Sequence, residues 1–315
     1  MKKLMTIVVL ALLAILITAC GNAEGSDGEA SGDQQEKESL TITHELDETE
    51  VEKNPETVVV FDFGALDTLD KLGVEVAGVP KSNLPEYLSK YAAEEYTNVG
   101  SLKEPDFETI YGLDPDLIII SGRQSGLYED LSEIAPTIYV GIDTANYMES
   151  FTNNVLTLGK IFGKESQAEE ELAKIEEKIQ TLKETASENN GKALVTLTTG
   201  GKVSAYGPGS RFGLIHDVFG LTPADDNIEA STHGMSISFE FIAEKDPDYL
   251  FVIDRDAVVG GEKSAKEVIE NELVKQTKAY QNDKIIYLDP NYWYLSGGGL
   301  ISMTEMIDEV SEGIK

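Results

Sequence analysis

The chain has 315 residues, 41% of them hydrophobic, which is long enough for two domains that each bury a core. Its 57 acidic residues outnumber 25 basic ones, and the formal net charge is −32. This charge excludes nucleic-acid binding, which needs a basic face, and simple adsorption to anionic lipid. Any anion-binding site in such a chain must therefore carry its own local group of positive charges.

The first residues predict a lipoprotein signal peptide over residues 1–19. Two lysines precede an apolar run, Thr6 to Thr18, that is short for a bilayer span. The run leads through Ala19 to Cys20 and resembles a bacterial lipobox, with Ile17 where leucine is more usual. We expect Cys20, the one cysteine of the chain, to carry lipid such as palmitate, and no disulfide can form within one chain. The alternatives are an uncleaved anchor helix and an ordinary signal peptide.

Residues 20–39 predict a flexible tether, because polar and small residues dominate and almost no apolar side chain is available for burial. Residues 40–145 are expected to form an N-terminal lobe. In this lobe apolar strands alternate with helices, which predicts a parallel sheet covered on both faces. The expected strands are 58–61, 76–79, 117–120 and 137–142, and the expected helices are 65–72, ending at Gly73, and 127–134.

The pattern changes to long helices over residues 146–190. Phe151, Val155 and Leu158 recur at helical spacing, and Gly163 interrupts the run. The four residues from Ser166 to Glu169 have the form of a capping box, which predicts a second helix from 166 to about 189. That helix would be roughly 36 Å long, enough to join two domains. An ordinary surface helix within one domain is the alternative.

Residues 191–315 are expected to form a C-terminal lobe that repeats the first. Strands are expected at 194–198, 203–206, 249–253 and 285–288, and a terminal helix from about 300. One sequence motif starts at Phe107 and recurs 132 positions later at Phe239. It consists of Phe-Glu, an isoleucine, Asp-Pro-Asp, an apolar run and an arginine. The repeat predicts two lobes that face each other across a cleft, each a mostly parallel sheet flanked by helices.

The repeated motif ends in Arg123 and Arg255, and the chain has one other arginine, Arg211. A guanidinium group is a planar, permanently charged fork that suits anionic oxygens. Arg123 and Arg255 each follow an apolar strand, where ligands bind in open α/β sheets, and Arg211 lies in a glycine-containing turn before a helix. The alternative for each is an ion pair with a nearby acid, such as Asp254 or Asp256. Rarity and matched positions favour a shared anion site.

Five further residues are candidate ligand contacts. Lys81 and Lys103 are expected near the cleft, although lysines are more often solvated surface groups. His233, beside a glycine, is the histidine that best fits a cleft. Trp293 and Tyr294 precede three successive glycines and a helix, which suits a large planar ligand or an anion. The alternative is a core position for the rings and a flexible turn for the glycines.

No metal site built by the protein is expected, because no histidine pair has ligand spacing such as HExxH and cysteine occurs once. No set of nucleophile and base is identifiable, which argues against an enzyme. Glu108 and Glu240 occupy equivalent positions in the two repeats, one in each predicted lobe.

Together these segments resemble the substrate-binding lipoproteins of iron-siderophore ABC importers, the helical-backbone class with the class III periplasmic-binding-protein fold. The resemblance covers essentially the whole mature chain. It is carried by the lipobox, both Asp-Pro-Asp strands, the linking helix and residues 58–64, 99–101 and 206–213. Residues 100–107, 230–234 and 293–299 are most similar to petrobactin-binding members of the family.

The resemblance implies a monomeric receptor, lipid-anchored on the outer face of the bacterial cytoplasmic membrane. Its ligand would be a ferric catecholate siderophore, petrobactin-like, held by Arg123, Arg211 and Arg255. The siderophore itself would coordinate the iron, so no cofactor is expected. Glu108 and Glu240 would dock onto arginines of a dimeric ABC permease that works with an ATPase.

Three other functions remain open at the level of sequence. The first is a haem-binding lipoprotein of the same fold, with His233, Met235 or a tyrosine as axial ligand. The second is a surface enzyme that uses the same cleft. The third is a structural adhesin, which needs no cleft lined for an anion.

Overall fold

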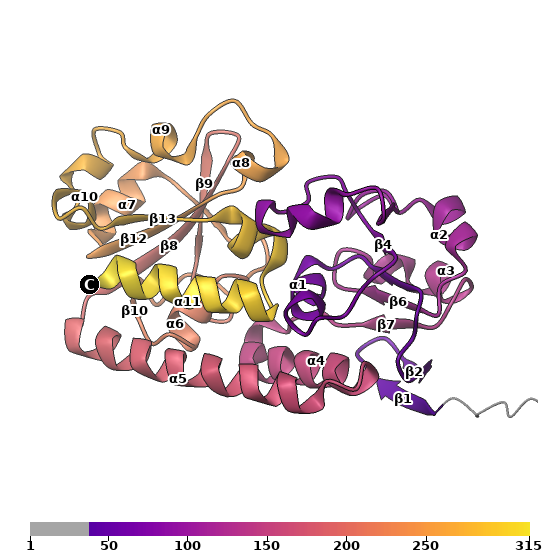
Figure 1. Ribbon diagram of the computed structural model, residues 1–315. Coiled ribbons are helices and arrows are strands. Elements are labelled where there is room, and N and C mark those ends of the chain that lie inside the picture. The colour runs from indigo at the N-terminus through magenta and orange to yellow at the C-terminus, as the bar shows by residue number, and fades with distance from the viewer. Residues whose placement is uncertain (1–37) are drawn as a thin grey trace, which may run out of the picture. The chain divides into compact units, whose positions relative to one another are not determined.

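The computed structural model describes residues 38–315, so the predicted signal peptide, Cys20 and most of the predicted tether lie outside the described residues. Two lobes each contain one main β-sheet, and long helices run alongside both (Figure 1). A hairpin of β1 (Ser39–Thr43) and β2 (Glu48–Glu52) opens the described chain. No helix in this part of the chain is long and apolar enough to cross a membrane.

The strands of the N-terminal lobe are β3 (Val58–Val60), β4 (Gly78–Val79), β5 (Thr97–Asn98), β6 (Leu117–Ile120) and β7 (Thr137–Tyr139). They form a parallel sheet in the order β5-β4-β3-β6-β7. Every residue of β3 and β6 is buried, as expected for apolar strands covered on both faces. The predicted strands are confirmed, three of them with shorter bounds.

The helical segments of this lobe are α1 (Phe63–Lys71), η1 (Glu86–Ala92), α2 (Phe107–Leu113), η2 (Ser125–Leu127), α3 (Tyr128–Ser132) and η3 (Thr144–Asn146). α1 begins directly after Asp62, whose carboxylate accepts a hydrogen bond from the first turn, and it is followed by Gly73 at φ +68°. A left-handed conformation of this kind commonly ends a helix, and it suits glycine.

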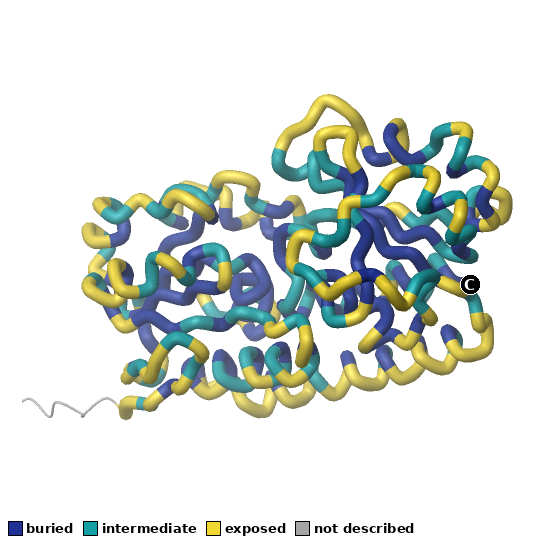
Figure 2. The backbone as a smooth tube through the Cα atoms, turned by 180° about the vertical axis from the view of Figure 1, so that it is seen from behind, coloured by how far each residue is buried: buried dark blue, intermediate teal, exposed yellow. Residues whose placement is uncertain are grey.

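Two long helices follow, α4 (Tyr147–Ile161) and α5 (Glu165–Asn189). α5 runs alongside both lobes, against α4 and against the C-terminal helix α11 (Leu300–Ile314) (Figure 1). Its buried residues, among them Ile175, Ile179 and Leu182, join a core that contains side chains of both lobes. Figure 2 shows most of the rest of this helix exposed. The prediction of a linking helix is therefore confirmed.

The predicted capping box at Ser166 is wrong. α5 begins at Glu165, with Lys164 at the capping position and no side chain bonded to the first turn. The reason lies in the short connection from α4. Gly163 takes φ +61°, and the backbone N–H of Lys164 donates to the carbonyl of Gly159 at 2.7 Å. One turn thus ends α4 and starts α5, which leaves Ser166 inside the helix.

The strands of the C-terminal lobe are β8 (Lys192–Thr199), β9 (Lys202–Tyr206), β10 (Thr222–Pro223), β11 (Met235–Ile237), β12 (Tyr249–Asp254) and β13 (Ile285–Leu288). They form a sheet in the order β11-β9-β8-β12-β13, with β10 also beside β8. The pairs of β8, β12, β13 and β10 are parallel, whereas β9 is antiparallel to both its neighbours. The sheet is thus mostly parallel on one side and antiparallel on the other.

The remaining helical segments are α6 (Leu214–Asp217), α7 (Phe239–Lys245), α8 (Asp256–Val259), α9 (Ala265–Ile269), η4 (Val274–Gln276), α10 (Lys278–Gln281) and the π-helical turn η5 (Asn291–Ser296). The internal repeat gives α2 and α7 the same length, and each ends in an aspartate with positive φ, Asp114 and Asp246. Asp116 and Asp248 then each accept a backbone N–H at the start of the lobe's central strand, both at 2.8 Å. Each Asp-Pro-Asp therefore ends a helix and fixes the next strand to its neighbour.

Candidate functional site

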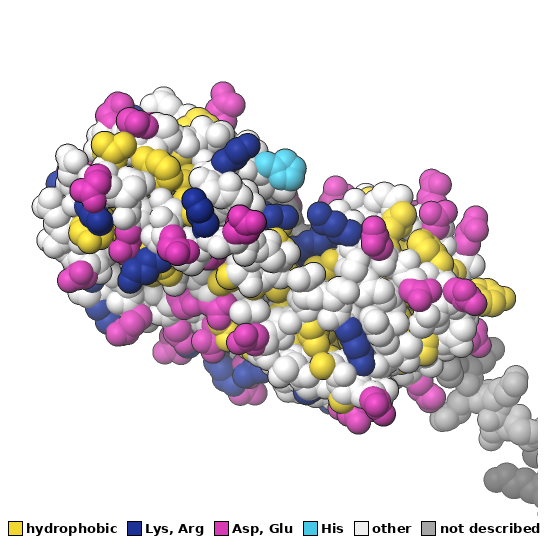
Figure 3. Space-filling view, turned by 90° about the horizontal axis from the view of Figure 1, so that it is seen from above, with side chains coloured by type: hydrophobic (Ala, Val, Ile, Leu, Met, Phe, Trp, Pro, Cys, Tyr) yellow, Lys and Arg dark blue, Asp and Glu magenta, His cyan; other side chains and the backbone are white. Residues whose placement is uncertain are grey.

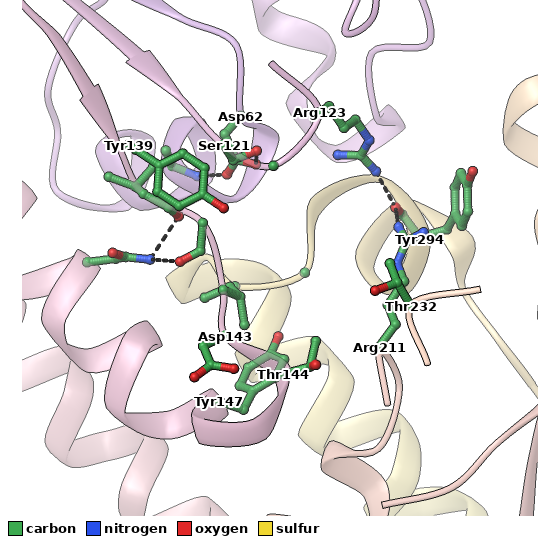
Figure 4. A pocket seen from close by; sticks show the side chains of 18 of the residues that line it. Asp62, Ser121, Arg123, Tyr139, Asp143, Thr144, Tyr147, Arg211, Thr232 and Tyr294 are labelled. Carbon is green, nitrogen blue, oxygen red and sulfur yellow. Dashed lines mark hydrogen bonds between the residues drawn. The ribbon is translucent and has the colours of Figure 1, made fainter. Parts of the chain in front are cut away.

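A cavity of about 970 Å³ lies between the lobes. Its N-terminal wall comes from residues that follow or end β3, β6 and β7 and from the start of α4, and its C-terminal wall comes from loops around Arg211, Thr232 and Tyr294 (Figure 4). Lys and Arg side chains gather where the surface is hollowed between the lobes (Figure 3). The site therefore lies at the carboxyl ends of parallel strands, where open α/β sheets bind ligands.

Two of the three arginines meet at one backbone carbonyl on the cavity wall. Arg123 of the N-terminal lobe donates from Nη2 to the carbonyl oxygen of Tyr294 at 2.8 Å. Arg211 of the C-terminal lobe donates from Nη2 to the same oxygen at 2.7 Å. Tyr294 lies on η5, and π-helical turns are frequent at functional sites. The carbonyl thus holds guanidinium groups of both lobes side by side at the cavity.

Neither Arg123 nor Arg211 forms an ion pair with a carboxylate among residues 38–315; their hydrogen bonds go to neutral carbonyls. Arg211 also lies over the Tyr294 ring, with 4.5 Å between the guanidinium carbon and the ring centroid. Burial and the positive charge of Arg123 lower the pKa of Arg211. Two like charges without a counter-ion make this wall ready for anionic oxygens.

Arg255 contacts Tyr294 but does not line the cavity. Its Nε donates to the Tyr294 hydroxyl at 2.8 Å and its Nη1 donates to the Thr199 hydroxyl at 2.9 Å, while an oxygen of Asp256 is 3.7 Å away. Burial alone would raise the pKa of Tyr294, but the hydrogen bond from Arg255 and the nearby arginine charges outweigh it and lower the pKa. Tyr294 therefore contacts every arginine of the chain.

The two predicted lysines are placed differently. Lys103 lines the cavity, and so does His233, which is exposed. Lys81 does not line it, because its Nζ donates to two backbone carbonyls at the end of η1, at 3.1 and 2.7 Å. A cation is favourable at that end of a helical turn, so the contacts of Lys81 are structural.

Trp293 lines the cavity although only 2% of it is exposed. Its Nε1 donates to Glu309 of α11 at 2.6 Å, and burial raises the pKa of Glu309 to about 6. The ring is therefore mostly a core side chain with one edge at the cavity, which combines the two interpretations open at the level of sequence.

The glycine run does not offer the N-terminus of α11 to a ligand. Asp67 of α1, fully buried, accepts hydrogen bonds there from the backbone N–H groups of Ile301 at 3.1 Å and Ser302 at 2.9 Å. A Cβ on Gly299 would lie 1.9 Å from this carboxylate, so the position requires glycine. Burial raises the pKa of Asp67 to about 7 although these donors oppose the shift. The anion at this helix end belongs to the protein itself.

Sequence reasoning missed most of the N-terminal wall. The Ser121 hydroxyl donates a hydrogen bond to the Asp62 carboxylate at 2.6 Å. Burial raises the pKa of Asp62, although this and other hydrogen bonds lower it. Asp62 and Ser121 follow β3 and β6, and Tyr139 ends β7, so the rule that selected Arg123 would have selected them too. Tyr147 opens α4, and no sequence signal separates it from the core residues of that helix.

Glu108 and Glu240 lie in the first turns of α2 and α7, are exposed, and do not line the cavity. Among residues 38–315, no group of His, Cys, Asp and Glu is close enough to hold a metal ion. The described residues thus offer charged hydrogen-bond donors for an oxygen-rich anion and no ligand set for a bare metal.

Comparisons with known proteins fit this geometry. A profile of the periplasmic binding protein family matches residues 58–292. The petrobactin-binding protein YclQ of Bacillus subtilis is 54% identical over the full length of both chains. Its crystal structure has a TM-score of 0.87, with 57% identity over 89% of this chain and 99% of that one.

Two relatives from the genus Vibrio are also similar. The crystal structure of the periplasmic catecholate-siderophore binding protein VctP from Vibrio cholerae has a TM-score of 0.83, with 38% identity over 87% of this chain and all of that one. The ferric-anguibactin-binding protein FatB of Vibrio anguillarum is 34% identical over 99% of this chain and 98% of that protein. Each relative is described by what it binds, and none by a reaction.

Proposed function

Because the chain belongs to the periplasmic binding protein family, we propose that it is a receptor that binds a ferric catecholate siderophore, petrobactin or a close relative of it. The ligand occupies the cavity between the lobes. The protein is a binding protein and not an enzyme. It needs no cofactor, because catechol oxygens of the siderophore coordinate the iron.

The observation that carries the proposal is the pair Arg123 and Arg211 on one carbonyl, without an acidic partner among the described residues. A ferric centre bound by catecholate oxygens carries net negative charge and presents acceptors to both guanidinium groups. A hydrogen bond to a charged group contributes about 1.5–3 kcal/mol. Two or three such bonds supply a substantial part of the roughly 12 kcal/mol that corresponds to nanomolar affinity, although these contributions are not additive.

Trp293 provides the assay, because the chain's one tryptophan lines the cavity. We expect ferric petrobactin to quench its fluorescence with submicromolar affinity, and a ferric hydroxamate, ferric citrate and haem to do so far more weakly. Arg123→Ala and Arg211→Ala should each weaken ferric petrobactin binding by roughly tenfold or more, at 1.4 kcal/mol per decade. Arg→Lys should restore affinity only in part, because the planar fork is lost.

Two results would contradict the proposal. The first is wild-type affinity in both alanine variants while they stay folded. The second is tight haem binding with a Soret band that disappears in His233→Ala, which would favour the haem-binding alternative.

The receptor works at the membrane surface. The lipobox supports lipid attachment at Cys20, and residues 20–39 would then tether the folded lobes to the outer face of the cytoplasmic membrane. Lipid on this cysteine, and not a membrane-spanning helix, would hold the chain there. The equivalent, exposed positions of Glu108 and Glu240 support docking of a monomer onto a dimeric ABC permease with its ATPase.

A further inference from the structure

The cavity has two walls of opposite charge. Asp62, Tyr139, Asp143 and Tyr147 lie together across open space from Arg123, Arg211 and Tyr294 (Figure 4). Glu45 also lines the cavity. A purely anionic ligand needs the arginine side, but three carboxylates on the same cavity would repel it. We call Glu45, Asp62 and Asp143 the acidic wall. An anionic iron centre alone does not account for these carboxylates.

Two carboxylates of the acidic wall, Asp62 and Asp143, are held in place by neutral donors. Asp62 accepts hydrogen bonds from Ser121 at 2.6 Å and from a backbone N–H of α1 at 2.8 Å. Asp143 accepts from the backbone of Ala145 at 2.9 Å and from the side chain of Asn146 at 2.8 Å. None of the acidic wall forms an ion pair with a lysine, arginine or histidine among residues 38–315. Arg123 is near enough to Asp62 to counteract part of the rise in its pKa that burial causes, but it does not pair with it.

Tyr147 supplies an independent sign of a ligand subsite. It is 7% exposed, and within residues 38–315 its hydroxyl has no hydrogen-bond partner. Figure 4 shows this hydroxyl directed into the cavity. Burial and the negative charges of Asp62 and Asp67 raise the pKa of Tyr147, so the group is a neutral phenol. The hydroxyl is thus free to pair with a polar group of a ligand that enters the cavity.

We propose that the acidic wall, with the hydroxyls of Tyr139 and Tyr147, is a second subsite that binds a protonated amine of the siderophore. An ammonium group is a donor only, so it needs the acceptors that carboxylates and phenol oxygens provide. Burial raises the pKa of Tyr139, and the charges of Glu45 and Asp62 add to this rise, so its hydroxyl is near these two acids. This inference rests on the proposed function and narrows its ligand to ferric chelates with a cationic amine beside the anionic iron centre.

The test uses two ferric bis-catecholamide probes that share one linker. In one probe the secondary amine of the linker is free and protonated at neutral pH, and in the other it is acetylated. The wild-type chain should bind the amine probe about fivefold more tightly than the acetylated probe by Trp293 quenching. Glu45→Gln and Asp62→Asn should each reduce this preference, and the double variant should bring it to about one. The affinity for the acetylated probe should stay the same or rise.

The choice of variants keeps folding and charge effects apart. Glu45 is exposed, and asparagine at position 62 can still accept the hydrogen bond that caps α1. Glu50→Gln is the matched control, since Glu50 is exposed, lies on β2 and does not line the cavity. Arg211→Ala should weaken binding of both probes and leave the preference for the amine intact.

Equal wild-type affinity for the two probes would overturn the amine subsite and leave the receptor function standing. A preference that survives in the folded double variant would do the same. Binding of neither probe by folded wild-type protein would overturn the proposed function together with this inference.

Discussion

Tyr294 uses its two polar groups for different arginines. Its carbonyl accepts from Arg123 and Arg211, whereas its hydroxyl accepts from Arg255, which does not line the cavity. A substitution of the side chain leaves the backbone carbonyl in place and can remove the hydroxyl. We therefore propose that Arg255 acts on the ligand through Tyr294, and the side chain of Tyr294 can be tested as a positioning group.

Tyr294→Phe should weaken ferric petrobactin binding by roughly five- to tenfold, about 1–1.4 kcal/mol at 1.4 kcal/mol per decade. The change removes the hydrogen bond to Arg255 and leaves the ring and the carbonyl. Tyr292→Phe, on the same turn but with its ring tilted against that of Tyr87, is the control and should bind like wild type. Additive losses in the double variant Tyr294→Phe/Arg255→Ala would refute the coupling, because coupled residues lose less together than the sum of their separate losses.

At the scale of single residues, the sequence predicted cavity residues best where a residue type is rare and occurs at regular positions. Arg123 and Arg211 were predictable because the chain has three arginines, and because Arg123 follows a strand and Arg211 lies in a glycine-containing turn before a helix. Lys81 also follows a strand, yet its flexible side chain turns back to η1. The hydroxyl of Tyr147 was not predictable, because its exposure to the cavity depends on how α4 packs between the lobes.

The contact between α1 and α11 joins elements far apart in the sequence. Asp67 and Thr68 of α1 accept hydrogen bonds from the first three backbone N–H groups of α11. These partners are 232 to 235 positions apart, so no local pattern announces them. The helices themselves were predictable from apolar spacing and glycine stops. The start of α5 was not, since the turn at Gly163 overrides the sequence pattern at Ser166.

Asp67, which caps the N-terminus of α11, makes the stability of the protein depend on pH. The folded pKa of Asp67 is about 7, above its ordinary value of 3.8, so the folded state retains a proton that the unfolded state loses. This contribution to the free energy of unfolding is complete below pH 4 and is lost as pH rises toward and through 7. Asp67→Asn cannot titrate. Between pH 5 and 7, wild-type stability should therefore fall relative to the variant by roughly 1 kcal/mol per pH unit.

Urea unfolding at pH 5, 6 and 7 measures this difference. Glu129→Gln, an exposed change on α3, is the control and should follow the wild-type profile. Parallel profiles for wild type and Asp67→Asn would show that Asp67 does not titrate in this range.

At the scale of the whole molecule, the internal repeat gives the two lobes equivalent outer positions. Glu108 and Glu240 begin helices of the same length in the two lobes and are both exposed. A dimeric permease is itself twofold and can present a basic pocket to each lobe. Charge complementarity of this kind mainly affects partner choice and the rate of association.

The double change Glu108→Ala/Glu240→Ala should therefore leave siderophore affinity intact and reduce iron uptake by cells. Glu94→Ala/Glu262→Ala makes the same change in charge at exposed positions elsewhere, and uptake should stay normal. Normal uptake by the Glu108/Glu240 variant at wild-type expression would refute the docking role.

Membrane attachment belongs to the same scale. Cys20→Ala should release the protein from the membrane or leave its precursor uncleaved. The change removes the proposed site of the acyl chains, and stable anchoring needs more than one such chain. Fractionation of cells and the mass of the mature N-terminus measure both outcomes. Recovery of the normal membrane-bound form from this variant would rule out lipid attachment at Cys20.

The position of the iron tests the central claim most directly. Crystals grown with ferric petrobactin and measured at the iron absorption edge should give one anomalous peak in the cavity between the lobes. Arg123 and Arg211 should contact the catecholate oxygens, and no protein atom should coordinate the iron. A peak outside the cavity, or iron coordinated by a side chain such as His233, would contradict the account.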